Sequence, residues 1–405
     1  MPQLREAVIV DYLRSAFSRS RPREPERDVF NSLRMDQVGG MLVKEMLKRT
    51  NVKPEEVNHV LVGTANPVGE QWTYGGRSLV FEAEMPFEVA AEQFDKQCGS
   101  TLATVNRGAM EIMLGYSDIV ISVGIEHMTH IPMGVDPKDP RAILRQPDMA
   151  FFTEERFKKY DMFTSLNMGL TAEKLFAESG LTREDMDRWA LRSHQLAAKA
   201  VEEGYFKGEI MPVEVTLPDG KKQVIDVDQS IRGDTTLEGL AQLKPSFKPD
   251  GQITAGNSSP LNAGATAIML MSKERAKAMG LKPLATIVSM GWAGVDPTVM
   301  GKGPVPASRM ALEKAGLTVK DIDYWEINEA FAIVTLYAIK QLGIDPEKVN
   351  IKGGAIAIGH PLGASGNRLV GTLARILNLK KGTFGIATAC IGGGQGAATL
   401  LKREE

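Results

Sequence analysis

The residue types best suited to chemistry in this chain are two cysteines and one histidine in glycine-rich surroundings. His360 stands between a glycine and a proline in GGAIAIGHPLGASGNRL, and Cys390 begins the loop CIGGGQG. Cys98 precedes a Gly-Ser turn that leads into an apolar helical run, QCGSTLATVNRGAMEIML. An imidazole exchanges protons near pH 7, and a thiolate is a strong nucleophile. Together these side chains could carry out covalent catalysis by a cysteine.

The local sequence around each cysteine affects how its thiol would react. The position of Cys98 near a helix N-terminus predicts a pKa below the usual value of about 8.5 for a free thiol. Cys390 lies at a strand end, where glycines leave backbone N–H groups free to bind an oxyanion. Taken singly, each pattern has a simpler alternative, an inert buried thiol or a loop that merely turns a strand into a helix.

Length and composition set the class of protein. A chain of 405 residues is too long to pack around one ordinary hydrophobic core, so two or three packed units are predicted. With 43% hydrophobic and 24% charged residues and a net charge of -2, it is typical of a globular enzyme with no bias toward nucleic acid or anionic membranes. Its apolar runs, such as IVISVGI at 119–125, are far shorter than the roughly 18 residues of a membrane span, so none is expected.

Two further features bear on where the protein works. Two cysteines are too few for a disulfide framework and favour a reducing cytoplasm. The arginine-rich stretch RSAFSRSRPREPER at 14–27 contains two glutamates and follows a strand-like run. It is therefore interpreted as a loop rather than a transit peptide.

Hydrophobic periodicity predicts an alternating α/β chain. Helical patterns occur at Met35–Thr50 and Arg309–Ala315, and Thr182–Glu203 is an amphipathic helix with an N-cap and early acids. His194 is expected on the exposed side of that helix. Because helices alternate with short strands, we expect βα units with parallel strands. The apolar runs typical of buried strands are EAVIV, NHVLVGTA, DIVISVGI, ATAIMLMS, LATIVSM, YWEIN, TFGIATA and AATLLK.

The chain also contains an internal repeat. An offset of 265 residues (322 minus 57) serves three separate elements, because it aligns Val57 with Ile322, Cys98 with Gly363 and Ile119 with Phe384. One offset for three elements favours a duplicated unit over chance. The first copy is interrupted by an insertion that should cover the core. The predicted units are an N-terminal half at 1–128 completed by 251–281, an inserted unit at 129–250, and a C-terminal half at 282–405.

Four segments in family order give the chain a specific resemblance to the thiolase family over essentially its whole length. They are TAGNSSPLNAGATA, NEAFA, GGAIAIGHPLGASGNRL and CIGGGQGAATLL. The resemblance implies acyl transfer between a coenzyme A thioester and an enzyme cysteine, with CoA as a substrate and no cofactor. It also implies a duplicated α/β fold of five layers, α-β-α-β-α, in which the insertion becomes a loop domain that covers the CoA.

The resemblance assigns catalytic roles one residue at a time. Cys98 matches the nucleophile that is acylated, His360 the histidine that activates it and helps bind the thioester oxygen, and Cys390 the acid/base for the acetyl α-proton. Asn328 matches the residue that positions a water in one oxyanion site, and the N–H groups of Cys98 and Gly392 match a second oxyanion hole. Cleavage of a 3-ketoacyl thioester needs a nucleophile for the ketone, stabilisation of the resulting oxyanion, and a group that protonates the departing acetyl-CoA carbanion. The glycines at 353–366 are then expected to let a thioester approach the backbone.

Four other residues match substrate contacts in the family. Ser259 fits a contact to the pantetheine, and Arg232 fits a contact to the nucleotide end of CoA. Met168 and Met300 fit positions that line the acyl pocket, with ordinary core methionines as the alternative. Thr101 departs from the family pattern, which has a glycine there, so the packing around the acyl group is left open.

Other functional classes find less support. A metal site at His127 and His130 lacks a second pair of ligands at suitable spacing, so no metal is expected. A condensing enzyme of the ketoacyl-carrier-protein synthase type has no equivalent of Cys390. A catalytically inactive, thiolase-like lipid-binding or scaffold protein would have no need of both cysteines and His360.

The expected direction of the reaction follows from the resemblance. The expected assembly follows from the resemblance together with a glycine-rich duplicated core whose strands lie near its surface. GIEHMTHIPMG and PVPASRMALEKAG look more like bacterial fatty-acid-oxidation thiolases. This favours thiolytic cleavage of 3-ketoacyl-CoA to acetyl-CoA and a shortened acyl-CoA, with biosynthetic formation of acetoacetyl-CoA as the alternative. The family likeness also predicts a homodimer or homotetramer and is compatible with a complex with a hydratase/dehydrogenase subunit.

Overall fold

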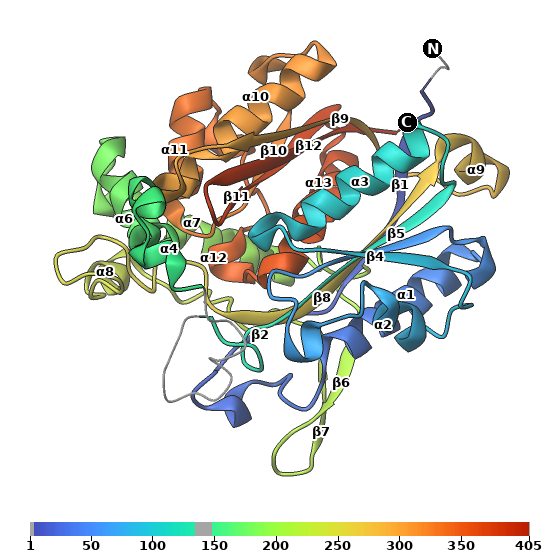
Figure 1. Ribbon diagram of the computed structural model, residues 1–405, viewed down its shortest axis with the longest axis horizontal. Helices are drawn as coiled ribbons and strands as arrows, with labels where there is room; N and C mark the ends of the chain where they lie inside the picture. Colours follow the sequence, from blue (N-terminus) through green and yellow to red (C-terminus); the bar gives the residue numbers. More distant parts are fainter. Residues whose placement is uncertain (1–3, 134–147, 405) are drawn as a thin grey trace.

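The computed structural model describes residues 4–133 and 148–404 (Figure 1). Within them, ten strands form one mixed sheet and two more form a separate hairpin, β6 (Val213–Thr216) and β7 (Lys222–Ile225). β2 (Ser18–Arg19) pairs with β8 of the large sheet. The other strands of that sheet follow the order β10 (Tyr324–Ile327), β11 (Phe384–Ile391), β12 (Gln395–Arg403), β9 (Ala285–Gly294), β1 (Ala7–Arg14), β8 (Asn262–Ser272), β5 (Ile119–His127), β3 (His59–Gly63) and β4 (Ala90–Phe94).

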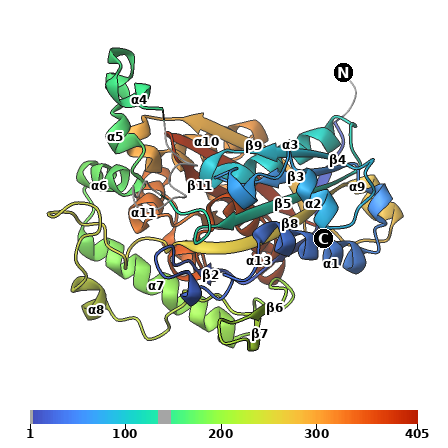
Figure 2. The same ribbon diagram turned by 60° about the horizontal axis from the view of Figure 1, so that its bottom comes forward.

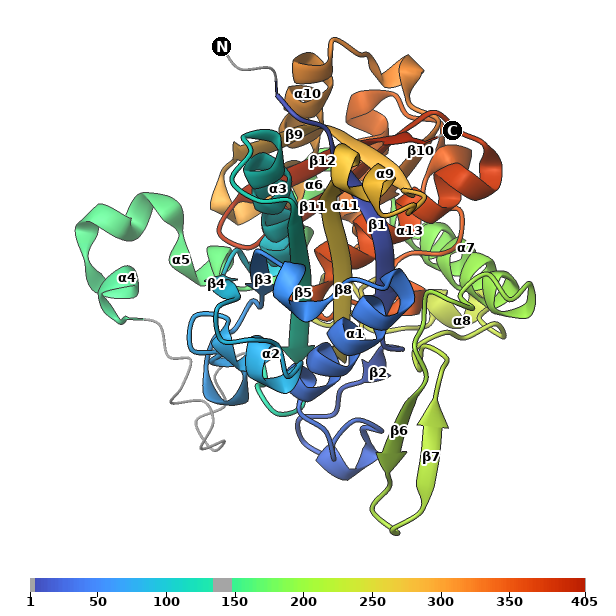
Figure 3. The same ribbon diagram turned by 90° about the vertical axis from the view of Figure 1, so that its right-hand side faces the viewer.

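Helices and strands stack in five layers. In the middle, α3 (Ser100–Met113) and α13 (Ser365–Lys380) pack against each other and against strands of both halves of the sheet (Figures 1 and 3). α1 (Met35–Thr50) covers β1, β5 and β8 and also packs on α2 (Arg77–Glu82). α10 (Pro304–Ala315) covers β9 and β12 and contacts α11 (Ala332–Leu342). The α-β-α-β-α order expected from the resemblance is therefore confirmed.

The offset of 265 residues recurs in the three-dimensional structure. β3 begins at His59 and β10 at Tyr324, and α3 begins at Ser100 and α13 at Ser365. The starts of β5 and β11 are separated by the same number of residues. The two copies meet where β1 pairs with β9 in an antiparallel ladder, so hydrogen bonds join them into one sheet. The domain limits given above stay a prediction.

The expectation of parallel strands is correct only in part. β3 is parallel to β4 and β5, and β10 is parallel to β11. β8 and β12 are antiparallel to their neighbours. β12 follows β11 after the three-residue turn 392–394, and so short a connection can join only antiparallel strands. All eight predicted apolar runs lie in strands. β4 (AAEQF) was missed because, as an edge strand, it is largely half-buried and lacks an apolar run.

The segment between β5 and β8 contributes short helices and one long one. α7 (Arg183–Glu202) begins after its N-cap Thr182, as predicted, and packs on α11, on α12 (Ala355–Ile358) and on α8 (Leu237–Ala241) (Figure 2). The placement of His194 on the exposed side of this helix is wrong, because that face packs inward and leaves His194 only 3% exposed. The remaining helices are α4 (Ala150–Thr153), α5 (Met162–Ser165), α6 (Met168–Ser179) and, after β8, α9 (Lys273–Ala278).

The arginine-rich stretch at 14–27 is mostly loop, as predicted, with three exceptions. Arg14 is the last residue of β1 and is fully buried, Ser18–Arg19 form β2, and Pro25–Arg27 form a short 3-10 helix. The described part of the chain has no helix with both the length and the apolar character of a membrane span.

Candidate active site

Cys98 is held in a tight turn at the start of the central helix α3. It is the middle residue of the 3-10 turn Gln97–Gly99, and it is 7% exposed. Gln97 has a φ of 46°, a left-handed conformation that costs a residue with a side chain strain energy. Its amide nitrogen donates to the carbonyl of Ala65 (3.0 Å), and the Ser100 hydroxyl donates to the Gln97 carbonyl (2.7 Å). These bonds fix the direction of the thiol.

The predicted lowering of the Cys98 pKa is wrong. Burial, with a smaller contribution from the carboxylate of Glu126, raises the pKa of the thiol to about 12. The N–H groups of Gly392 and of Cys98 itself face the sulfur and lower the pKa, but they offset burial only in part. The resting side chain is therefore a protonated thiol, which needs a base before it can act as a nucleophile.

His360 is positioned by hydrogen bonds from three directions. Its backbone N–H donates to Asn262 Oδ1 (2.8 Å), and its ring Nδ1 lies 2.6 Å from the hydroxyl of Ser365. Its ring Nε2 lies 3.3 Å from Nδ2 of Asn328. Because an amide nitrogen can only donate, Nε2 carries the lone pair and Nδ1 carries the proton. Nε2 is thus the basic atom of the site.

The electrostatic surroundings of His360 keep the ring neutral. Burial and, to a smaller extent, the guanidinium of Arg368 together lower the pKa of His360 to about 3. The imidazole is therefore unprotonated throughout the physiological range. An unprotonated ring can accept the proton of a thiol that is itself protonated at rest.

The glycines around His360 have a different role from the one expected. A Cβ on Gly363 would lie 2.5 Å from the Cα of Thr64, and one on Gly366 would lie 2.2 Å from the backbone nitrogen of Leu102. Both positions therefore allow close packing of protein backbone from the other half of the molecule. The expectation that the glycines at 353–366 make room for a thioester is wrong at these positions.

Cys390 is the last residue but one of β11 and is completely buried. Burial raises the pKa of its thiol, and the nearby Cys98 raises it further. Both cysteines are free. The two thiols predicted to work together are therefore close enough for Cys98 to affect the pKa of Cys390. Gly392, two residues after Cys390, lies on the loop whose backbone N–H faces Cys98.

Thr101 connects the helix of the nucleophile to the loop of the histidine. Its hydroxyl donates to the carbonyl of Gly363 (2.6 Å) and accepts from the backbone N–H of Asn367 (3.0 Å). The side chain is fully buried. A glycine at this position would leave both backbone groups without this partner, so the departure from the family pattern adds a link between the two halves of the site.

An apolar cavity of about 340 Å³ opens beside the thiol and the imidazole. Cys98, His360, Ser259, Met168 and Met300 all line it, as the resemblance implied. Its size is within the range of small-molecule sites. Apolar wall residues outside every segment that carries the resemblance are Leu166 and Phe247, whereas Met128, Phe331 and Leu362 lie in GIEHMTHIPMG, NEAFA and GGAIAIGHPLGASGNRL.

The other predicted site residues lie outside this wall. Asn328 is fully buried behind His360, and its Oδ1 has no partner among the described residues. Arg232 is exposed and lies outside the cavity wall. Its backbone N–H donates to His194 Nδ1 (3.2 Å). The structure therefore brings the residues predicted to be catalytic together but leaves Arg232 at the surface.

Glu126 is a buried carboxylate that the sequence patterns did not indicate. It accepts from the backbone N–H groups of Ala65 (2.8 Å) and Gly363 (2.9 Å) and from the amides of Asn66 and Gln71. These four donors lower the pKa of the carboxyl group and offset part of the cost of burying its charge, but burial is the larger effect and the pKa stays raised. Glu126 thereby ties loops of both halves together beside Cys98.

A second group of titratable side chains lies near the end of β5. Ligand atoms of Glu70, His127 and His130 lie within 4.8 Å of one another, a group that could hold a metal ion. The two rings stack with centroids 3.6 Å apart. His130 contacts Glu70 at 2.9 Å and the carbonyl of Asn31 at 3.1 Å, and His127 contacts the carbonyl of Phe30 at 3.2 Å. The ring nitrogens thus already have protein partners, and the expectation of no metal stays a prediction.

The arrangement is suited to covalent catalysis by a cysteine, because a protonated thiol, a neutral imidazole, an amide and a second thiol surround one end of an apolar cavity. Comparison with known families shows the family to which the chain belongs. A model of the thiolase N-terminal domain matches residues 7–274, and a model of the thiolase C-terminal domain matches residues 281–403. The chain belongs to the thiolase family.

Individual relatives match this chain over almost its whole length. The chain is 42% identical to a 3-ketoacyl-CoA thiolase of Marinobacter nauticus and 41% identical to one of Hahella chejuensis, with 98% of each chain covered. Among solved structures, it is similar to the Bacillus anthracis acetyl-CoA acetyltransferase (TM-score 0.86, 34% identity, 100% of both chains). It is equally similar to the human mitochondrial 3-ketoacyl-CoA thiolase (TM-score 0.86, 34% identity, 99% of both chains).

Proposed function

We propose that this protein is a 3-ketoacyl-CoA thiolase, which cleaves 3-ketoacyl-CoA with CoA into acetyl-CoA and a shortened acyl-CoA. The observation that carries the proposal is the buried thiol of Cys98 on the wall of an apolar cavity, next to the neutral imidazole of His360. The names of the relatives at about 40% identity support the degradative direction.

The first half-reaction transfers the acyl group to the enzyme. His360 Nε2 accepts the proton of the Cys98 thiol, and the thiolate attacks the 3-keto carbon of the substrate. The resulting oxyanion is stabilised by the N–H groups of Cys98 and Gly392. The bond between C2 and C3 then breaks, its electron pair stays on C2 as the acetyl-CoA carbanion, and Cys390 donates the proton that completes acetyl-CoA.

The second half-reaction releases the acyl group. Cys390, now a thiolate, takes the proton from the thiol of an incoming CoA. The CoA sulfur attacks the acyl carbon on Cys98, and the Cys98 thiolate leaves and regains its proton from the imidazolium of His360. During the first half-reaction, His360 and a water placed by Asn328 contact the thioester oxygen of the acetyl unit. At the end of the second, Cys390 has regained a proton and His360 has lost one, so both side chains are back in their starting protonation states.

The remaining residues divide the substrate between cavity and surface. Met168 and Met300 contact the acyl chain, and Ser259 contacts the pantetheine, which their positions on the cavity wall support. Arg232, at the surface, contacts the nucleotide end of CoA. The two free thiols of the site suit a reducing compartment, which supports a cytoplasmic location.

The proposal is tested by measuring thiolysis rates over 3-ketoacyl-CoA substrates of increasing chain length. We expect turnover of chains longer than acetoacetyl-CoA, because the cavity wall is apolar and extends away from the thiol. Activity limited to acetoacetyl-CoA, with condensation of two acetyl-CoA molecules, would favour the biosynthetic alternative. Absence of turnover and of Cys98 acylation with every substrate would favour the inactive lipid-binding alternative.

The assembly is expected to be a homodimer or a tetramer built from dimers. β4 is the outermost strand of the sheet, and its free edge offers unpaired backbone groups to a second chain. Trp72 (62% exposed), Tyr74 and Phe87 (78% exposed) lie on the segments that flank it. A monomer that exposes a strand edge beside such side chains risks nonspecific association. The edge therefore supports self-association through β4.

Light scattering during size-exclusion chromatography checks this expectation. At micromolar concentration the active protein should have two or four times the chain mass of 44.1 kDa. An active species that elutes with the mass of a single chain under the same conditions would contradict it.

A further inference from the structure

Two connections join helix α13 to strand β10 beside the catalytic histidine. In the first, the Ser365 hydroxyl lies 2.6 Å from Nδ1 of His360, and Nε2 of the same ring lies 3.3 Å from Nδ2 of Asn328. Ser365 is the first residue of α13. Asn328 directly follows β10 and extends its pairing with β11, because its N–H donates to the carbonyl of Thr388 (2.9 Å). The positions of α13 and β10 therefore determine where the imidazole and the amide meet.

The second connection is a buried ion pair between the same two elements. Nη1 of Arg368 lies 2.6 Å from Oε2 of Glu326, and both side chains are fully buried. Arg368 is three residues after Ser365 on α13, and Glu326 is two residues before Asn328. Residues three apart in a helix and two apart in a strand lie on the same face. The ion pair therefore lies next to the first connection.

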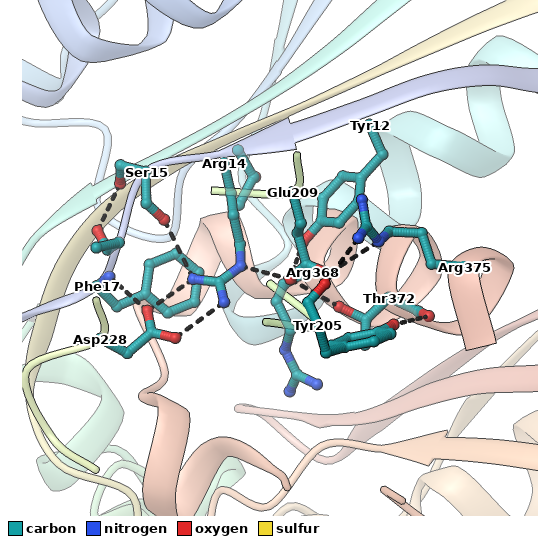
Figure 4. A network of polar contacts seen from close by, with 12 residues as sticks. Tyr12, Arg14, Ser15, Phe17, Tyr205, Glu209, Asp228, Arg368, Thr372 and Arg375 are labelled. Carbon is teal, nitrogen blue, oxygen red and sulfur yellow. Dashed lines mark hydrogen bonds and ion pairs between the residues drawn. The ribbon is translucent and has the colours of Figure 1, made fainter. Parts of the chain in front are cut away.

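A separate buried network holds α13 about two turns further along (Figure 4). The guanidinium of Arg375 contacts Oε2 of Glu209 (3.5 Å), and Oε1 of Glu209 accepts from Nε of Arg14 in β1 (2.7 Å). Figure 4 draws no contact between Arg368 and the other residues of this network. Within the described part of the chain, the hydrogen-bond partner of Arg368 is Glu326 alone. Two of its three nitrogens are thus left for another partner.

The two connections leave four buried polar atoms without a hydrogen bond. They are Nε and Nη2 of Arg368, Oε1 of Glu326 and Oδ1 of Asn328, none of which has a partner among the residues that the structure describes. Buried polar atoms are nearly always paired, and those that find no protein partner typically bind an internal water. These four atoms belong to three residues that share one interface between α13 and β10, so a single water site can serve them.

The four atoms have the donors and acceptors that a bound water needs. The two nitrogens of Arg368 can only donate, and the amide oxygen of Asn328 can only accept. Burial raises the pKa of Glu326 to about 8 despite the opposite effect of Arg368, so its Oε1 can accept or, once protonated, donate. A buried water makes about three hydrogen bonds, and it can accept from the guanidinium while it donates to the amide.

The orientation of the Asn328 amide decides which nitrogen of His360 is basic. With Nδ2 facing Nε2, as in the structure, Nε2 carries the lone pair that accepts the proton of Cys98. An amide turned by 180° would present Oδ1 to Nε2, which would then have to carry a proton and could no longer act as the base. Positive charge behind the amide favours the observed orientation, because a side-chain amide turns its oxygen toward such a charge.

We propose that the Arg368–Glu326 pair positions the amide of Asn328 through a buried water molecule, and so keeps Nδ2 directed at the catalytic histidine. The inference rests on the proposed function, in which His360 is the base for Cys98. The water binds Oδ1 in the interior, whereas the water at the thioester oxygen is placed on the cavity side. Arg368 and Glu326 do not line the cavity, so they are positioning residues that act through the amide and the imidazole.

Replacement of Arg368 by methionine tests the proposal in the assembled enzyme. Methionine fills similar space but has no N–H group, and Glu326 can become neutral by binding a proton. The kcat for thiolysis should fall about ten- to hundredfold, the effect of losing a hydrogen bond to a charged group. The KM for CoA should stay at the wild-type value, because neither residue of the pair lines the cavity. A wild-type kcat, or a raised KM for CoA with kcat unchanged, would overturn the proposal.

Arg375→Met is the matched control. It removes the same group from the same helix, and its partner Glu209 is also a buried carboxylate, but Arg375 has no connection to Asn328 in the described part of the chain. Both kcat and KM should therefore equal those of the wild type. An equal fall of kcat in Arg368→Met and Arg375→Met would show a general disturbance of α13 and overturn the specific role of Arg368.

The tautomer of His360 gives a readout that a loss of packing alone would not change. Labelling of the five histidines with ¹⁵N distinguishes rings protonated on Nδ1 from rings protonated on Nε2 by nuclear magnetic resonance. The signal of His360 is the one that is missing in His360→Ala. Wild type and Arg375→Met should show the proton on Nδ1, and Arg368→Met should show a fraction with the proton on Nε2. A ring of Arg368→Met protonated on Nδ1 alone would overturn the proposal.

A second variant keeps the test decisive if Arg368→Met does not fold. Arg368→Lys keeps a positive charge beside Glu326 but has one nitrogen in place of three. Because contact with Glu326 occupies that nitrogen, the tautomer of His360 should shift as in Arg368→Met. A wild-type tautomer in Arg368→Lys would show that the charge alone is sufficient, and would overturn the role assigned to the water.

A high-resolution crystal structure of the wild-type enzyme tests the water directly. We expect an ordered water within hydrogen-bond distance of Oδ1 of Asn328 and of Nε or Nη2 of Arg368. A direct bond from a protein donor to Oδ1, or no water between the two side chains, would overturn the proposal.

The labelling and the crystal structure need no turnover, so they separate this inference from the proposed function. The expected water and tautomer shift would support the positioning role even if the wild type cleaved no 3-ketoacyl-CoA. Thiolysis by Arg368→Met at the wild-type kcat would keep the proposed function and reject the positioning role.

Discussion

Replacement of Cys98 by alanine is expected to abolish turnover and covalent acylation together. Cys98 is the cysteine on the cavity wall, whereas Cys390 is completely buried beneath it. No other thiol is placed to take the acyl group, so the loss in rate should be on the order of 10⁶-fold, as for other nucleophiles whose removal stops a covalent mechanism. Mass spectrometry of the intact chain after incubation with an acyl-CoA should show one acyl group on the wild type and none on the variant.

The variant must remain folded for this result to bear on mechanism. The alanine removes a single sulfur from a turn that is held by the hydrogen bonds of Gln97 and Ser100, and these do not involve the Cys98 side chain. An unchanged circular dichroism spectrum and oligomeric mass would establish that the fold is intact. Acylation of the Cys98→Ala chain at another residue, with turnover retained, would show that the nucleophile has been assigned wrongly.

The fold could be predicted from the sequence because its signals are local and repeated. Buried strands such as β5 and β11 are continuous apolar runs, and a single offset relates them to each other. Edge strand β4 carries no such run. It pairs with another strand on one side only, and its side chains are largely half-buried. The antiparallel pairing of β8 was also hidden, because the long segment at 128–261 separates it from β5.

The sequence was enough to name candidate site residues, but not to predict their pKa values. Cys98 and His360 stand in recognisable segments, yet the direction of the Cys98 pKa shift depends on burial, which arises from packing between the two halves. The local signal, a helix N-terminus, points in the opposite direction and is the smaller effect. The role of Gly363 was hidden for the same reason, since it packs against Thr64, about 300 positions earlier in the chain.

The second thiol should be separable from the first by experiment. In Cys390→Ala, Cys98 and His360 keep their partners, so acetyl-CoA should still label one acetyl group per chain. Exchange of the acetyl α-protons in heavy water should nevertheless fall by about 10² to 10⁴, because the group that removes them is gone. This corresponds to a barrier higher by about 3 to 5 kcal/mol. Exchange followed by nuclear magnetic resonance and labelling followed by mass spectrometry measure the two steps independently.

The structure makes this separation a demanding test. Burial and the neighbouring Cys98 both raise the pKa of Cys390, so the side chain is a protonated thiol unless it has just given up its proton to substrate. Such a group is a proton donor to a strongly basic carbanion, and its thiolate is then a base strong enough to take the proton from CoA. A Cys390→Ala variant that loses acetyl labelling along with exchange would point to a structural role in holding Cys98. One that exchanges α-protons and turns over at the wild-type rate would remove Cys390 from the mechanism altogether.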